Sequence, residues 1–284
     1  MKRSVVIAFI FLTGVAEVEA LTFDKPITLN LKKIDHKEKQ KLRNRLTHLI
    51  SGKMIKHMEA SALKEAAQIC VQLGDLVDAV SYLDQFIVTT NSVTEQKEAK
   101  LQRADIYFER GILKKAADYY DDFQKLYPGD TNVTYAQYKG ILSKYYCTLD
   151  EERDQTLTQQ TINLCNSFIE HMHDGDYVDE VKTIRMQCYQ RLLDHEMGVF
   201  EFYFKQGKFK AAETRLANIQ KSYENKLAIV TPKVLHCTYR LAQAKGETKV
   251  AQEIMASLQE QYPSYFRDTI QYPIKKKVNY LTRF

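Results

Sequence analysis

The chain has little of what interrupts regular structure: ten glycines and five prolines in 284 residues. Glycine and proline often end helices and strands, so their scarcity favours long helices. Beyond the first residues, no apolar run is long enough to span a bilayer. With 44% hydrophobic and 27% charged residues, the composition is that of a globular protein. This length can bury the core of one large or two small domains without disulfide or metal support.

Catalytic motifs are also missing. The chain contains no G-x-S-x-G, no H-E-x-x-H and no Walker loop. A metal site at His171 and His173, beside Glu170 and Asp174, is disfavoured because histidines two positions apart point in different directions on a helix. Nor are residues left over for a separate transglycosylase lobe. We therefore expect a binding protein that is not an enzyme and has no cofactor, no metal and no nucleic-acid partner.

The first twenty residues have the pattern of a secretory signal. Lys2 and Arg3 precede an apolar run of eleven residues from Val5 to Val15, and small residues follow up to Ala20. This order predicts a signal peptide at residues 1–20 that is cleaved after Ala20. The run is shorter than the about 20 residues that span a bilayer, which leaves an uncleaved anchor as the less favoured alternative.

Cysteines are few and irregularly spaced. No C-x-x-C pair occurs, so neither a disulfide framework nor a zinc site is indicated. We expect the cysteines to be buried as small apolar side chains, with a Cys147–Cys165 disulfide as the alternative. The five are Cys70, Cys147, Cys165, Cys188 and Cys237.

Positive charge is concentrated at the two ends. Residues 21–57 contain ten Lys or Arg against three Asp or Glu, and residues 264–284 contain five against one. The sequence between them is acidic. We predict a basic extension at 21–57, helical from Asp35 onward, and a basic tail at 268–284. These ends can contact anionic lipid or an acidic partner, or they can be plain solvated tails.

An internal repeat follows four of the ten glycines. An alanine stands five residues after each glycine, and a large residue, apolar in character, stands nine residues after it. A glycine ends a helix easily because it accepts positive φ, and an alanine lets the next helix pack closely. This is the pattern of the tetratricopeptide repeat, a helix–turn–helix of about 34 residues that stacks into a solenoid. The glycines are Gly74, Gly111, Gly207 and Gly246, followed by Ala79, Ala116, Ala212 and Ala251, and by Leu83, Tyr120, Leu216 and Met255.

The gap between Gly111 and Gly207 contains a third, irregular repeat. Its expected helices are residues 133–146 and 155–172, joined by a long loop, with Thr161 in the place of the alanine. The predicted fold is therefore an all-α tetratricopeptide-repeat solenoid of about five repeats at residues 58–267. Val199, Phe200, Tyr203 and Phe204 are expected to pack on both sides of the fourth repeat's first helix.

Several stretches resemble one family closely. They are "NVTYAQYKGIL" (132–142), "RDQT" (153–156), "LLDHEMGVFEFYFKQGKFKAAETRL" (192–216) and "LQEQYP" (258–263). Together they are similar to the BamD (ComL) family of outer-membrane assembly lipoproteins, and the similarity extends over roughly residues 59–263. The matching positions in the long stretch are His195, Glu196, Val199, Tyr203, Gly207, Phe209, Ala211, Ala212 and Arg215.

The resemblance implies a periplasmic scaffold of the β-barrel assembly machinery. C-terminal repeats of the family bind the POTRA domain of a BamA-type barrel protein, and N-terminal repeats receive unfolded barrel precursors; other Bam lipoproteins are further possible partners. On this reading Arg215 and Glu196 are candidate partner-binding residues, with an intramolecular ion pair of Arg215 as the alternative. Arg153 and Asp154 are secondary candidates that we expect mainly to order the loop. Repeat packing is the expected role of Tyr135 and Tyr138.

One departure from the family concerns its lipid anchor. The family carries a lipobox with an acylated cysteine, whereas the region "AEVEALTFD" has none, and Cys70 is the first cysteine of the chain. We therefore expect an unlipidated periplasmic protein that is peripheral to the outer membrane, held by a partner or by its basic ends. The alternative function is a YbgF-like division coordinator. Those proteins carry an N-terminal coiled coil, but residues 21–57 show no sustained heptad pattern.

Overall fold

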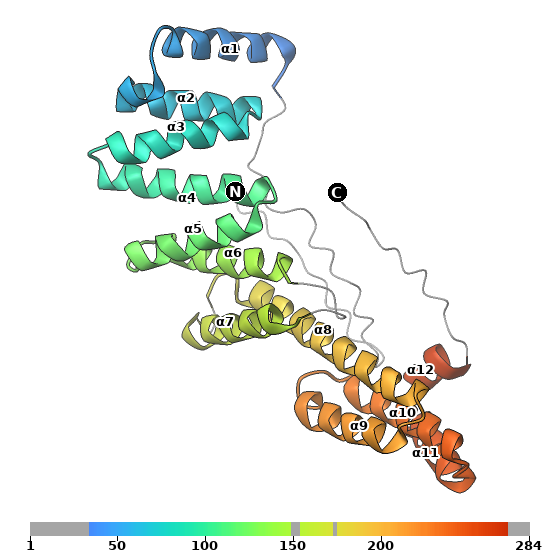
Figure 1. Cartoon of the computed structure of the whole chain (residues 1–284). Coiled ribbons are helices and arrows are strands. Elements are labelled where there is room, and N and C mark those ends of the chain that lie inside the picture. Colours follow the sequence, from blue (N-terminus) through green and yellow to red (C-terminus); the bar gives the residue numbers. More distant parts are fainter. Residues whose placement is uncertain (1–33, 149–153, 173–174, 272–284) are drawn as a thin grey trace. The chain divides into compact units, whose positions relative to one another are not determined.

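The computed structural model describes residues 34–148, 154–172 and 175–271, and every regular element in these ranges is a helix (Figure 1). They form two compact units, taken separately here: an N-terminal unit that ends at His195 and a C-terminal unit that begins at Glu196. The expected signal peptide and most of the basic tail lie outside the described residues, as do Arg153, His173 and Asp174.

The N-terminal unit is a stack of helices in which each packs on the next. Figure 1 shows α1 to α6 lying side by side in chain order. The elements are α1 (His36–Ile50), η1 (Ile55–His57), α2 (Ala60–Leu73), α3 (Leu76–Thr89), α4 (Val93–Glu109), α5 (Leu113–Leu126), α6 (Val133–Tyr146), α7 (Thr156–Met172) and the first part of α8 (Val178–Lys205).

The C-terminal unit contains the end of α8 and the helices that follow. These are α9 (Phe209–Tyr223), α10 (Val230–Lys245), α11 (Thr248–Gln261), the short α12 (Pro263–Tyr265) and a π-helical turn, η2 (Phe266–Gln271). The pairs α2/α3, α4/α5, α6/α7, α8/α9 and α10/α11 give five helix–turn–helix repeats in the described residues. The predicted all-α repeat solenoid is confirmed.

The repeat pattern has the geometry that its residues predicted. The four repeat glycines have φ between 68° and 85°, a region that other residues avoid. Ala79, Ala116 and Ala212 are fully buried, and Ala251 is 5% exposed. In the third repeat Thr161 is buried in the alanine position, and its Oγ1 donates to the carbonyl oxygen of Leu157 at 2.8 Å. The larger side chain is tolerated there because its hydroxyl group has a partner.

The aromatic stripe of α8 belongs to the core of the C-terminal unit. Phe200 is fully buried and stacks on Phe204, with ring centres 5.8 Å apart, and Phe204 contacts Phe209 at 6.1 Å. Val199 and Tyr203 are half-buried. Large aromatic side chains on this helix therefore serve packing, as expected.

All five cysteines are free thiols, and all but the half-buried Cys147 are buried. The alternative Cys147–Cys165 disulfide does not form. Burial raises the pKa of both Cys165 and Cys188 to about 12, so these thiols are neutral and behave as apolar side chains.

The helix expected from Asp35 onward is present as α1. The Asp35 carboxylate accepts the Glu38 backbone N–H at 2.7 Å and caps the helix. Arg45 joins α1 to α2 through two hydrogen bonds to the Glu65 carboxylate, at 2.6 and 3.0 Å. None of the helices in the described residues is both long enough and apolar enough to cross a membrane.

Candidate binding surfaces

The two leading candidate residues meet on the surface of the C-terminal unit. Arg215 on α9 donates from Nη1 to Oε2 of Glu196 on α8 at 2.8 Å. Their side chains are 32% and 25% exposed, so a partner can reach both. Arg215 follows the buried Ala212 by one helical turn, and the close approach of the two helices at that alanine brings the guanidinium to Glu196. The pair lies within one repeat, and its role in partner binding stays a prediction.

A second ion pair in this unit was not predicted. Arg240 on α10 donates from Nη1 and Nη2 to the two carboxylate oxygens of Glu201, and its guanidinium lies 4.6 Å from the centre of the Phe204 ring. The hydrogen bonds from Arg240 lower the pKa of Glu201. The pair joins consecutive repeats, because its members are 39 residues apart. That spacing equals the distance from Gly207 to Gly246, which was the only sequence signal for it.

Of the two candidate residues in the loop before α7, the structure describes only Asp154, whose contacts are local. Arg153 is outside the described residues. Oδ1 of Asp154 accepts the backbone N–H of Thr156 at 3.1 Å and its hydroxyl at 2.7 Å, and these bonds lower the pKa of the exposed carboxyl group. Bonds of this kind order the start of a helix, here α7. A contact of Asp154 with a partner remains untested.

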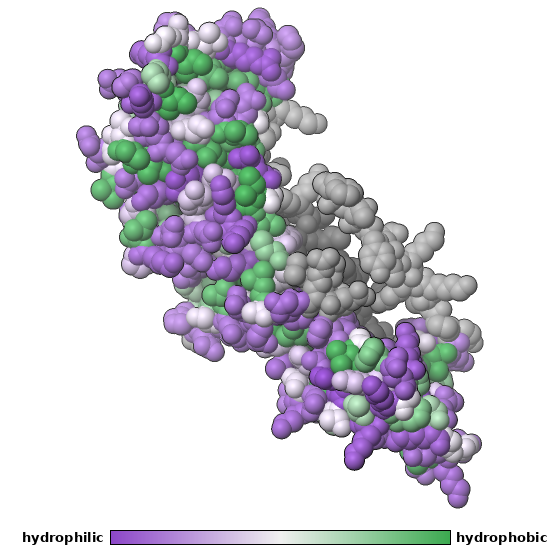
Figure 2. All heavy atoms as spheres, viewed as in Figure 1, coloured by the Kyte–Doolittle hydropathy of each residue, from purple (hydrophilic) through white to green (hydrophobic). Residues whose placement is uncertain are grey.

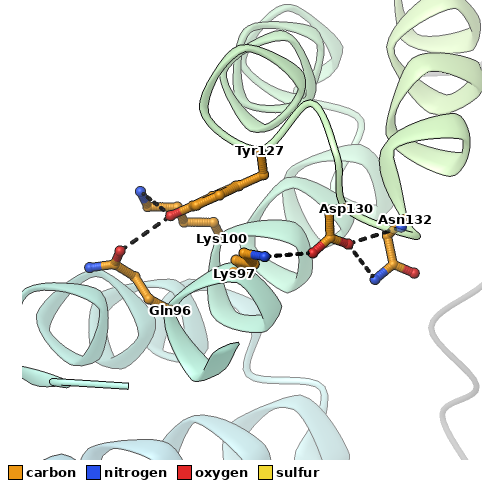
Figure 3. Close-up of polar contacts among 6 residues, drawn as sticks. All are labelled: Gln96, Lys97, Lys100, Tyr127, Asp130 and Asn132. Carbon is orange, nitrogen blue, oxygen red and sulfur yellow. Dashed lines mark hydrogen bonds and ion pairs between the residues drawn. The ribbon is translucent and has the colours of Figure 1, made fainter. Parts of the chain in front are cut away.

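The N-terminal unit has a cationic and aromatic cluster that sequence reasoning missed (Figure 3). Lys100 on α4 donates to the hydroxyl of Tyr127 at 3.0 Å, and that hydroxyl donates to Oε1 of Gln96 at 3.2 Å. The ammonium groups of Lys97 and Lys100 each lie 5.2 Å from the centre of the Tyr127 ring. Tyr127 directly precedes Pro128, and no sequence pattern marked it as a candidate binding residue.

Asp130 connects this cluster to the start of α6. One carboxylate oxygen receives the Lys97 ammonium at 3.0 Å, and the other accepts the backbone N–H of Asn132 at 2.9 Å and its side-chain amide at 3.2 Å. Figure 3 shows these bonds together. They lower the pKa of Asp130 and keep Lys97 beside Tyr127. Two lysines around a tyrosine can attract an anionic group such as a carboxylate.

The stretch 132–142, which carried part of the resemblance, contributes two side chains to a largely buried polar network. Oδ1 of Asp105 on α4 accepts the hydroxyls of Tyr120 at 2.5 Å and Tyr135 at 2.8 Å. Lys139 is 1% exposed, and its ammonium lies 3.5 Å from the centre of the Phe108 ring. Burial raises the pKa of Asp105 and lowers that of Lys139. These groups hold α4, α5 and α6 together, and Lys139 is too deeply buried to contact a partner.

Tyr138 also serves packing. Its ring stacks on Tyr177, with centres 4.6 Å apart and planes 4° from parallel. Tyr177 has φ of 68°, which is unfavourable for any residue with a side chain, so the stack holds a strained residue before α8. Both Tyr135 and Tyr138 thus have inward contacts with the protein.

The metal candidate receives no support from the described residues. His171 makes a local contact at the end of α7, 2.6 Å from Nδ1 to the carbonyl oxygen of Ser167. Within ranges 34–148, 154–172 and 175–271, no three His, Cys, Asp or Glu side chains gather as metal ligands would.

Known proteins resemble this chain over the repeats. Relatives named outer membrane protein assembly factor BamD include one from Neisseria meningitidis serogroup B, 23% identical over 139 residues, 45% of this chain and 52% of the relative. The Caulobacter vibrioides protein is 25% identical over 124 residues, 44% and 39% of the two chains. That of N. meningitidis serogroup A is 21% identical over 178 residues, 59% and 66%. The chain thus spans about half the length of the curated relatives it matches.

A family model reaches further than these pairwise matches. The family YfiO, described as outer membrane lipoprotein, matches residues 56–258, from η1 into α11. The match includes the irregular third repeat and the Arg215–Glu196 pair. It confirms the resemblance to BamD: the chain belongs to the YfiO family of outer membrane lipoproteins.

Proposed function

We propose that this protein is a scaffold without catalytic activity in the assembly of β-barrel proteins into the outer membrane. The observation that carries the proposal is the family match over residues 56–258, which coincides with the helix pairs of the solenoid. Stacked repeats provide extended surfaces for protein partners. The place of action is the periplasm, peripheral to the outer membrane.

The proposed partner of the C-terminal unit is the POTRA domain of a BamA-like barrel protein. Arg215 and Glu196 are partly exposed and lie in one of the stretches that resemble the BamD family. A guanidinium has five N–H donors, so Arg215 can bind a partner carboxylate while it remains bonded to Glu196. Arg153 and Asp154 are secondary contacts in this proposal.

For unfolded barrel precursors, the proposed contact is the cluster around Tyr127. Lys97 is already paired with Asp130, so Lys100 supplies the positive charge and Tyr127 the aromatic ring, which suit the carboxylate and the aromatic residues of an unfolded chain end. Such a contact needs no folded epitope on the client. Other Bam lipoproteins are further proposed partners.

Crosslinking in intact envelopes, followed by affinity purification and mass spectrometry, tests the proposal. We expect recovery of a POTRA-bearing barrel protein. Recovery of division or peptidoglycan proteins instead would favour a YbgF-like coordinator and overturn the assembly role. Hydrolysis of peptidoglycan by the exported protein would overturn the scaffold itself.

A further inference from the structure

The first layer of the N-terminal unit is rich in positive charge. Between Ile34 and His57 there are seven Lys or Arg against two Asp or Glu, whereas residues 58–263 carry 24 against 30. Figure 1 shows α1 as the first helix of the stack, and hydrophilic residues cover most of its visible side in Figure 2. We call residues 36–57 the α1 surface.

The cations of α1 are available for a partner. Lys37, Lys39, Lys41 and Arg43 are all exposed, and within the described part of the chain none of them forms an ion pair. Lys37 and Lys41 are one helical turn apart, as are Lys39 and Arg43, so two cationic rows run along the helix. By contrast, Lys64 and Arg103 in the same unit form ion pairs with carboxylates of other helices.

The turn after α1 adds exposed apolar side chains. Met54 and Ile55 are 61% and 37% exposed, and the exposed Lys53 and Lys56 flank them. The next apolar residue, Met58, is 4% exposed and ties the turn to the body. Apolar side chains between lysines suit the boundary between lipid headgroups and acyl chains, where both kinds of group are accommodated.

The α1 surface is formed before any partner binds. The Asp35 cap and the two Arg45–Glu65 hydrogen bonds hold the helix, and Leu42 and Leu46 are half-buried. Every residue of α1 is nevertheless at least partly exposed, so core packing does not explain the conformation of this basic segment. A preformed helix binds without the cost of ordering it.

We propose that the α1 surface binds an anionic phospholipid bilayer directly. Lys37, Lys41, Lys53 and Lys56 contact the headgroups, and Met54 and Ile55 enter the interface. An acidic protein would account for the lysines but leave the apolar pair between them unexplained. The contact goes beyond the proposed function, which names protein partners, and it does not depend on the identity of those partners.

Vesicle flotation of the exported protein tests the contact. We expect binding to phosphatidylglycerol-containing vesicles and little binding to pure phosphatidylcholine. Binding should weaken strongly with salt, because the Debye length falls from about 10 Å at 0.1 M to about 3 Å at 1 M. Replacing Lys37, Lys41, Lys53 and Lys56 by Gln should lower affinity by about 100-fold or more, since each cation contributes about fivefold near an anionic surface.

The matched control removes the same charge elsewhere. Lys125, Lys210, Lys221 and Lys249 are also exposed, and their replacement by Gln should leave vesicle affinity within about threefold. If both variants lost vesicle affinity equally, or if neither lost any, the assignment of the contact to α1 would be overturned. Circular dichroism on both variants establishes that they are folded.

A second variant tests the choice of lipid over protein. Replacing Met54 and Ile55 by Ser should lower vesicle affinity by about tenfold while its salt dependence is unchanged. If this variant bound vesicles as tightly as the wild type, the bilayer would not be the partner. The same conclusion would follow if the wild type captured an acidic protein but bound no vesicles. All variants should still recover the POTRA-bearing protein from envelopes. A failed vesicle test thus stays distinct from a failed assembly role.

Discussion

The buried charged groups of the N-terminal unit contrast with the more exposed ion pairs of the C-terminal unit. In the N-terminal unit, Asp105 and Lys139 are enclosed between α4, α5 and α6, where tyrosine hydroxyls and an aromatic ring satisfy them. In the C-terminal unit, the side chains of Arg215–Glu196 and Arg240–Glu201 remain between 25% and 34% exposed. Removing one member of the enclosed group leaves a buried charge without its partner, whereas the exposed pairs are within reach of solvent and contribute little to stability.

The sharpest test of this contrast is the loss of the Asp105 carboxylate. Asp105→Ala leaves two tyrosine hydroxyls without their acceptor and Lys139 without the nearby negative charge. We expect the N-terminal unit to lose about 3–5 kcal/mol of stability. Hydrogen exchange, which reports the two units separately, measures the loss. Glu196→Ala is the matched control and should cost less than about 1 kcal/mol. Equal losses would remove the distinction between the units.

A second test concerns helix packing in the C-terminal unit. Ala212 is fully buried in α9, so Ala212→Leu should destabilise the unit by about 1–3 kcal/mol through overpacking. Ala217 on the same helix is exposed, and Ala217→Leu should be nearly neutral. Urea unfolding of the two variants compares them. A neutral Ala212→Leu would show that this unit tolerates change in its interior as well as on its surface.

The helix pairs were predictable because their requirements are local and recur. A positive φ needs glycine and a close helix approach needs alanine, so Gly207 and Ala212 marked a repeat without any knowledge of its neighbours. The third repeat was located from its flanking units, and its first helix occupies the expected residues 133–146. Hydrophobic spacing and turn residues thus determined most of the fold.

The polar contacts were harder to predict because they depend on which side chains meet across repeats. Lysine is rarely buried, and no feature of "YKG" indicated that Lys139 would lie under Phe108. Arg215 and Glu196 were both selected as candidates through the family resemblance, but nothing in the sequence showed that they form a pair. Such pairings follow from helix rotation and side-chain rotamers, which a residue pattern does not specify.

Reversing the charge of Arg215 tests whether the exposed Arg215–Glu196 pair takes part in partner binding. Arg215→Glu places two carboxylates together on the surface and should weaken binding of the POTRA-bearing partner by about tenfold or more. The melting temperature should hardly change, because half-exposed ion pairs contribute little to stability. Lys210→Glu, an equal charge change at an exposed position of α9, is the control. Isothermal titration calorimetry with the POTRA domain of the proposed partner measures the affinity of both variants. If Arg215→Glu binds as tightly as the wild type, Arg215 is not part of the interface.

The smallest expected effect concerns acid pH, which should change the stability contributions of Glu201 and Asp105 in opposite directions. The Glu201 pKa is lowered by its hydrogen bonds to Arg240, so its stabilising contribution is present above the unfolded value of about 4.3 and is lost as pH falls through the folded value. Burial raises the pKa of Asp105, so its contribution is complete below about 3.9 and is lost as pH rises through the folded value.

Glu201→Gln and Asp105→Asn separate these two contributions. As pH falls from about 6 to about 3, the advantage of the wild type over Glu201→Gln should shrink, and its advantage over Asp105→Asn should grow. Hydrogen exchange across this range follows each unit by itself. A change of the same sign for both variants would mean that the folded state lowers the pKa of Asp105, as it does for Glu201. The enclosed and the exposed charges would then differ in position but not in their electrostatic environment.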